Sequence, residues 1–332
     1  MKINKSTLAA TVLATLGLSM AGQASAGEYA RSYLSIDNLQ LLISDDGGVT
    51  NGGNTLKSFN FNLTNSSTLG GNTIGSGDFC AGVGPNLGNN NCGPLGARVD
   101  ALVVTQGAPA QGENTFTFNG PGVGQYSNAD SVIYQTQLTG DGSTSTEQIA
   151  EAEIQSISNA SSLADISSTT GFTFKFTVAG ANVVAISFGA AWDKLVDIND
   201  PTAATATSQA NAKVQFELSN DATGDKVIWA PTGLGNDCAV LGLAGACVTA
   251  GAGNLNEDLS IATVPASTDA RAGAGNFSMF FDGLVDGEWS LSLNAVTSTL
   301  VSRTVPEPSL LIMLGLGLAG LGATSIRRKK RV

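Results

Sequence analysis

Two pairs of acidic residues have the chemistry of a general acid and a general base. Glu151 lies near Glu153 and Asp193 lies near Asp197, and a glycosidase needs only two such carboxylates. The 332-residue chain has no histidine, which excludes Ser-His-Asp and Cys-His triads and His-ligated zinc. The Glu pair stands in a charge-flanked segment, and the Asp pair follows an expected strand near a turn. We therefore interpret these acids as solvated surface residues and expect no enzymatic activity.

Asp193, Asp197 and Asp200 form a dense group of carboxylates, the ligands that calcium prefers in proteins. Their spacing matches no EF-hand loop. Turn formation is a simpler explanation, because Asp and Asn favour turn conformations. We therefore expect no cofactor and keep calcium at this loop as the alternative.

Tryptophan rings offer a second binding chemistry, because an exposed indole can stack on a sugar ring. Trp192 and Trp229 lie near expected strand ends and are the candidates for ligand contact. The alternative, which we favour, is that both fill the core, as we expect for Trp289, which begins a strand with inward-facing leucines.

Four cysteines occur as two local pairs, Cys80 with Cys92 and Cys238 with Cys247. An exported protein is expected to form disulfides. Three pairings are possible, and we favour the two local ones because each would close a Gly/Asn-rich loop. Free buried thiols are the alternative, and the spacings and the lack of histidine argue against zinc.

The last 28 residues combine three features of a membrane sorting signal. An uncharged apolar run, 310–326, is near the short limit for a helix that crosses a bilayer, at about 1.5 Å per residue. A basic cluster follows and should stay in the cytoplasm. The prolines before the run favour an extended, protease-accessible segment. The residues are Val305, Pro306, Glu307 and Pro308 before the run, and Arg327, Arg328, Lys329, Lys330 and Arg331 after it.

This arrangement resembles the PEP-CTERM sorting signal of Gram-negative bacteria. The resemblance implies an exosortase, a membrane-embedded cysteine transpeptidase, which cuts near Pro306-Glu307-Pro308 and releases or transfers the upstream domain. It also implies a protein of the cell surface or extracellular matrix that is associated with exopolysaccharide and biofilm. The alternative is an ordinary single-pass anchor, which would also place the main domain outside the cytoplasm.

The N-terminus has the pattern of a signal peptide. Lys2 and Lys5 precede an apolar stretch, and Ala24-Ser25-Ala26 is a small-x-small cleavage site, so the mature chain should begin at Gly27. An uncut signal anchor is the alternative. We therefore divide the chain into a signal peptide (1–26), an exported domain (27–304) and a sorting signal (305–332).

The exported part is acidic and poor in charged residues. Between Gly27 and Pro306 it holds nine Lys/Arg and 26 Asp/Glu, a net charge of −17, which makes nucleic acid a poor partner. Gly, Ser, Thr, Asn and Ala dominate, which is typical of short strands and turns. Segments 29–43 and 171–229 are also similar to a group of PEP-CTERM exoproteins named after a Glu-Asp-Ser-Ala-Pro motif, although that motif is absent here.

Alternating apolar residues predict about ten strands in an all-β, antiparallel sandwich or jelly-roll-like domain, followed by a C-terminal transmembrane helix. Segments 172–188, 214–229 and 277–300 each predict a hairpin, and 115–119 predicts a strand. Segment 146–157 is ambiguous, and we expect a short helix there. The long Gly/Asn-rich stretch 65–94 is expected to be a surface loop.

Together these features predict an exported structural or adhesive protein of the cell surface or matrix. Its expected partners are an exosortase, the inner membrane during transit, and extracellular polysaccharide. The alternatives are a carbohydrate-binding module for exopolysaccharide and, less favoured, a glycan-active enzyme.

Overall fold

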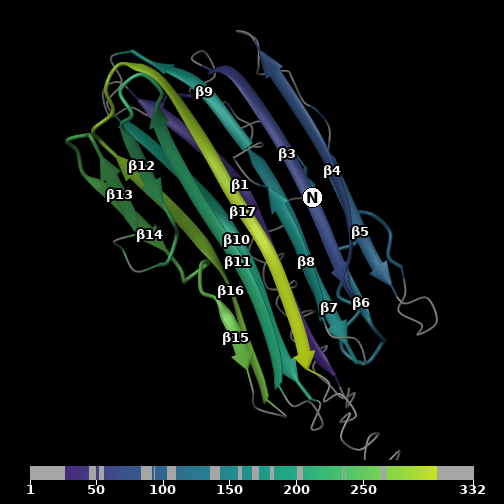
Figure 1. Cartoon of the computed structure of the whole chain (residues 1–332). Coiled ribbons are helices and arrows are strands. Elements are labelled where there is room, and N and C mark those ends of the chain that lie inside the picture. Colours follow the sequence, from purple (N-terminus) through teal and green to yellow (C-terminus); the bar gives the residue numbers. More distant parts are fainter. Residues whose placement is uncertain are drawn as a thin grey trace, which may run out of the picture.

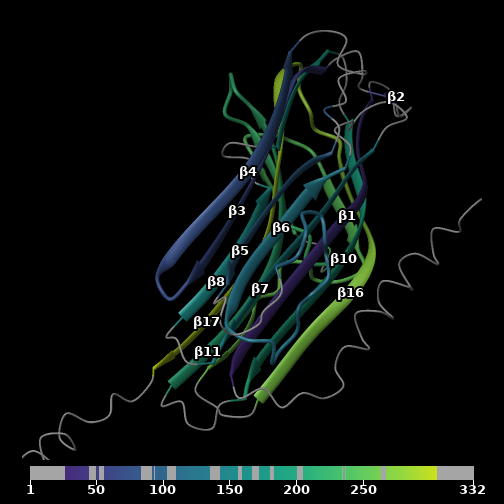
Figure 2. The same cartoon turned by 90° about the vertical axis from the view of Figure 1, so that its right-hand side faces the viewer.

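Two antiparallel β-sheets pack face to face in the computed structural model of the chain (Figures 1 and 2). The structure describes residues 27–44, 50–51, 56–83, 92, 94–102, 110–134, 143–155, 159–166, 172–179, 183–199, 205–233, 235, 237–262 and 267–304. These residues include no helix, and so none that could cross a membrane. The predicted all-β sandwich is confirmed, and the expected helix at 310–326 lies outside the described ranges.

Sheet A has eight strands, and sheet B has nine. Sheet A runs β14 (Cys247–Gly251), β16 (Ser267–Phe281), β10 (Val183–Ile198), β1 (Glu28–Ser44), β7 (Thr144–Ile154), β6 (Tyr126–Ile133) and β5 (Leu95–Leu102), and β2 (Thr50–Asn51) pairs with β1. Sheet B runs β13 (Cys238–Leu241), β12 (Lys226–Trp229), β11 (Thr205–Asn220), β17 (Gly287–Thr304), β8 (Asn159–Ile166), β3 (Leu56–Leu69) and β4 (Asn72–Val83). Two short strands complete sheet B: β15 (Leu259–Ala262) pairs with β11, and β9 (Phe172–Val178) pairs with β17 and β3.

The core lies between the sheets and follows the period of two in the sequence. Phe59, Phe61 and Leu63 of β3 are all buried, whereas Asn60 between them is exposed. Because successive side chains of a strand point to opposite faces, this alternation selects the inner face of sheet B. Phe188 from sheet A stacks on Phe277 at 5.3 Å and also lies near aromatic rings of sheet B, which joins the two layers.

Two of the three predicted hairpins are wrong. The strands β9 and β10, which form segment 172–188, belong to different sheets, and so do β16 and β17 in segment 277–300. In both segments the chain therefore crosses from one sheet to the other. The hairpin in segment 214–229 is confirmed, since Phe216 of β11 pairs with Trp229 of β12.

Three further expectations are corrected. Segment 146–157 was expected to be a helix, but β7 occupies most of it as a strand between β1 and β6. Stretch 65–94 was expected to be a surface loop, but β3 continues to Leu69 and β4 follows after the turn at Gly70 and Gly71. Segment 115–119 is not a strand.

Each flank of the sandwich contains one disulfide. Cys80 of β4 in sheet B is bonded to Cys92, which precedes β5 of sheet A. Cys238 of β13 in sheet B is bonded to Cys247 of β14 in sheet A. The structure thus contains the two pairings that the sequence favoured. Each closes a short loop and links the two layers at one edge.

Candidate functional site

The two predicted processing sites flank the same end of the sandwich, which we call the processing end. The described chain begins at Gly27 before β1 and reaches Thr304, the last residue of β17. Figure 1 shows the start of β1 and the tip of β17 close together. The predicted signal-peptide residues Ala24 and Ala26, and the sorting residues 305–331, lie outside the described ranges.

Contacts at the processing end connect both termini of the exported domain. The carbonyl oxygen of Gly27 accepts a hydrogen bond of 3.0 Å from the Asn199 amide. Glu28 is fully buried, and its carboxylate lies 3.7 Å from the Arg303 guanidinium, which also donates to the Gln155 carbonyl. The first residues of β1 in sheet A are thereby joined to the last residues of β17 in sheet B.

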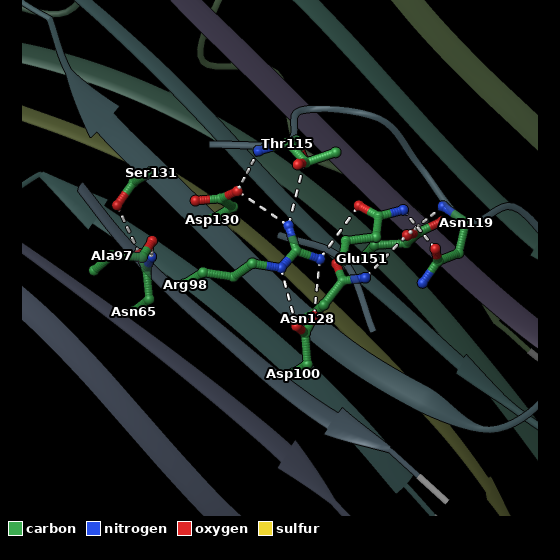
Figure 3. Close-up of polar contacts among 11 residues, drawn as sticks. Asn65, Ala97, Arg98, Asp100, Thr115, Asn119, Asn128, Asp130, Ser131 and Glu151 are labelled. Atoms are coloured by element: carbon green, nitrogen blue, oxygen red, sulfur yellow. Dashed lines mark hydrogen bonds and ion pairs between the residues drawn. The ribbon is translucent and has the colours of Figure 1, made fainter. Parts of the chain in front are cut away.

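A second group of polar and charged side chains lies on the outward side of sheet A. We call this group the covered polar face. Its side chains come from β5, β6, β7, β1 and β10. Residues 110–125, the cover segment, donate hydrogen bonds to several of them, and Figure 3 shows those from Thr115 to Asp130 and from Asn119 to Glu151. Glu151 and Glu153 are completely buried here. The interpretation of these two acids as solvated surface residues is wrong, because the cover segment shields the outward side of β7.

Arg98 is the cation at one side of this face. Its guanidinium donates to both carboxylate oxygens of Asp100 at 2.8 and 3.0 Å, and to Asp130 at 3.0 Å. Asp130 also accepts a 2.9 Å hydrogen bond from the Thr115 amide of the cover segment. Burial raises the pKa of Asp130, while Arg98 and this amide act in the opposite direction. Arg98 therefore neutralises carboxylates that would be costly to leave unpaired.

Glu151 holds the middle of the cover segment. Its carboxylate accepts hydrogen bonds from the amides of Asn119 at 2.9 Å and Gly120 at 2.8 Å, and from the Tyr29 hydroxyl at 2.7 Å. Glu153 accepts a further 2.8 Å bond from the Gly122 amide. Charged acceptors bonded in this way hold a loop against a sheet strongly. In this arrangement the two glutamates serve as anchors for the cover segment, and neither is open to solvent.

The remaining acid pair is also engaged within the protein. Asp193 forms a 3.0 Å ion pair with Arg31, whose guanidinium lies over the Phe118 ring of the cover segment. Asp197 accepts hydrogen bonds from Thr268 and from the side chain of Asn199. Both acids are at most 7% exposed, so they are not solvated surface residues, and burial raises the pKa of each.

The structure therefore describes only two of the three residues that were considered as calcium ligands. Asp193 and Asp197 have the protein partners given above, and Asp200 lies outside the described ranges. Within those ranges no three His, Cys, Asp or Glu residues are grouped so as to hold a metal ion.

Trp192 and Trp229 lie in the core, as favoured from the sequence, and are not exposed as sugar-stacking faces. Trp229 is 1% exposed and Trp192 is 8% exposed, and both belong to the main core. Trp192 lies near the middle of the 16-residue strand β10, although it was predicted to lie near a strand end. The core alternative holds for both, and Trp289 is buried as expected.

Sequence reasoning missed Arg98, Asn128 and Asp130 as members of the covered polar face. The sequence does contain a signal for it. Three glutamates at odd positions of β7 share one side of the strand, and they would need a cover or a solvent-facing surface. The Gly-rich stretch 120–124 supplies amides in conformations that suit a close approach to such acids, since Gly120 and Gly122 have positive φ angles.

A family model described as the PEP-CTERM protein-sorting motif matches residues 304–329. The chain carries a PEP-CTERM sorting motif. No curated protein and no solved structure matches the chain significantly.

The PEP-CTERM motif agrees with the resemblance drawn from the tail and supports an exported protein that is sorted by an exosortase through a membrane-anchored intermediate. The match begins at residue 304, the last residue of β17. The PEP-CTERM motif thus follows the sandwich at the processing end without an intervening domain in the sequence.

Proposed function

We propose that this protein is a structural or adhesive component of the cell surface or extracellular matrix, associated with exopolysaccharide and without enzymatic activity. An exosortase cuts the anchored precursor near Pro306-Glu307-Pro308 and frees the sandwich from its membrane segment. The observation that carries the proposal is the PEP-CTERM motif at residues 304–329, directly after the last strand of the sandwich.

The geometry of the processing end supports this maturation. A signal peptide before Gly27 and a membrane span after Thr304 would both leave the domain at one end, so the sandwich could fold while tethered to one membrane surface. The buried contact between Glu28 and Arg303 keeps the two exit points together. Release then requires cleavage only at this end.

The core and the disulfides of the domain support a structural role. The aromatic core joins both sheets, and a disulfide closes each flank, which suits a protein that must persist outside the cell. The four acids considered as glycosidase carboxylates all accept hydrogen bonds from amide, hydroxyl or guanidinium groups of the protein. They are Glu151, Glu153, Asp193 and Asp197. An acidic exterior should limit direct adherence to acidic polysaccharides unless divalent cations bridge the two.

The role can be tested in the native bacterium. A strain without the protein is complemented with the wild type or with a triple variant, Pro306→Ala, Glu307→Ala and Pro308→Ala, and the polysaccharide retained in the matrix is measured. We expect wild-type protein in the matrix fraction, the variant in the membrane fraction, and reduced retention of polysaccharide in both the deletion strain and the variant strain. Unchanged retention in the deletion strain would contradict the matrix role while leaving the sorting statement intact.

A further inference from the structure

The edge strand β4 has features of a surface that pairs with another strand. It ends sheet B, and among the described residues only β3 pairs with it. Its register with β3 runs through twelve consecutive pairs without a bulge, from Ser58 opposite Val83 to Leu69 opposite Asn72. At about 3.3 Å per residue this gives an uninterrupted edge of about 40 Å. Figure 2 faces this flank and shows β4 running along it at full length.

Natural sheets normally protect such an edge. The usual devices are short strands, lysine or proline residues, bulges, or a covering segment. β4 contains no lysine and no proline, and residues 72–77 are all exposed. The opposite flank differs in the length of its edge strands, because β13 and β14 have only four and five residues; a disulfide lies on both flanks.

Apolar side chains also lie along this edge. Phe79 is 73% exposed on the outward side of β4, and Ile74 is 44% exposed on the inward side. Ile74 also lines an open cavity of about 530 Å³ between β4 and β5, together with Leu69 and Leu102. A strand added to β4 would cover both side chains while its backbone paired with the free edge.

Charge opposes a second copy of this chain least at the β4 edge. The exported part is strongly acidic, so two copies repel each other over most of their surface. Asp78 is the single charged residue of β4, and its carboxylate accepts hydrogen bonds from the amides of Phe79 at 2.9 Å and Gly96 at 3.3 Å. Repulsion between copies is therefore small along β4.

Preorganisation points to the same partner. An extended peptide would have to lose conformational freedom to pair with β4, whereas a second β4 is already an ordered strand of equal length. Antiparallel pairing of two identical edges also generates a closed two-fold dimer. We propose that two copies of this protein associate through β4, so that their nine-stranded sheets continue into one another. This inference does not depend on the proposed matrix role.

The test uses the processed extracellular protein purified from native cells, studied by sedimentation over a wide range of concentration. We expect the wild type to reach twice the mass of one chain, and the variant Phe79→Glu to stay at the mass of one chain. The matched control is Val248→Glu, which changes a side chain that is 59% exposed on the opposite flank and should dimerise like the wild type. Because Phe79 is exposed, its replacement should not affect folding. Ile74→Glu is a second variant with the same expected loss.

Hydrogen exchange locates the contact. Amides of Asn72–Val83 should gain protection as the wild-type concentration rises, whereas those of Cys247–Gly251 should not. A wild type that stays at the mass of one chain would overturn the proposal and leave the edge to a different partner. Dimers that persist in Phe79→Glu, or protection gained only elsewhere, would also overturn it.

Discussion

The outward faces of the two sheets differ in whether another part of the chain covers them. Every residue of β6 in sheet A is buried, whereas β11 in sheet B alternates between buried and more exposed positions. The ion pairs follow this division. The side chains of Arg98 and Asp130 are 5% and 0% exposed, and those of Lys213 and Asp258 are 54% and 58% exposed. The polar side of a sheet can thus be buried under another segment or exposed to solvent. Removing one partner of an ion pair should destabilise the protein strongly in the first case and only slightly in the second.

The largest effect is expected from Arg98→Met. This change leaves the fully buried carboxylate of Asp130 and the partly buried carboxylate of Asp100 without their cation, so the free energy of unfolding should fall by about 3–5 kcal/mol. Urea-induced unfolding of the processed protein measures this quantity. A loss no larger than that of an exposed pair would mean that the covered polar face is solvated, and the distinction between the two faces would fail.

Glu151→Gln should weaken the attachment of the cover segment. The amide side chain keeps one acceptor oxygen, so it cannot accept from Asn119, Gly120 and Tyr29 as the carboxylate does. We expect a loss of about 1.5–3 kcal/mol and faster hydrogen exchange at the amides of the cover segment. Glu217→Gln, which alters a partly exposed pair with Lys226, is the control and should leave exchange at the cover segment unchanged.

Lys194 extends the comparison to the inner face of sheet A. It is fully buried, its ammonium group donates to the Glu257 carbonyl, and burial lowers its pKa to about 8. Because the charged form is disfavoured in the folded protein, Lys194→Met should raise the free energy of unfolding at pH 7 by about 1–3 kcal/mol.

The advantage of Lys194→Met should depend on pH with a definite sign. Between the folded pKa of about 8 and the ordinary value of 10.5, unfolded wild-type protein holds a proton that folded protein has lost. Wild-type stability therefore rises with pH in this window, and the difference from the variant shrinks. Unfolding of both proteins at a series of pH values measures it, and a difference that grows above pH 8 would refute the assignment.

The smallest effect is expected from Lys213→Met on the outward side of sheet B. Its 3.1 Å pair with Asp258 is solvated on both sides, so the change should cost less than about 1 kcal/mol, and raised salt should reduce that cost further. A cost comparable to that of Arg98→Met would show that this face too is covered in solution.

The sequence predicted the fold class and the local cysteine pairs because both depend on short-range patterns. Phe59, Phe61 and Leu63 identify an inward face without any knowledge of the partner strand. Pairing partners are different, because alternation in β9 and β10 is equally compatible with a hairpin and with strands in two facing sheets. The turn residues between them suit both arrangements, so tertiary packing decides.

The covered polar face escaped prediction for a related reason. The last seven residues of β7 are all buried, so the strand lacks the exposed positions that mark a half-buried strand. Ala150 and Ile154 then also fit helical spacing. Nothing near β7 in the sequence shows that residues 110–125 fold back over it, since that contact depends on the strand order of sheet A.

Intact mass of the extracellular form from native cells tests the proposed maturation most directly. A mass that begins at Gly27 and ends near Pro306, together with retention of the Pro306→Ala, Glu307→Ala, Pro308→Ala variant in the membrane, is the predicted result. An extracellular or surface form that still contains residues 310–332 would contradict it, because the protein would then be a permanently anchored one.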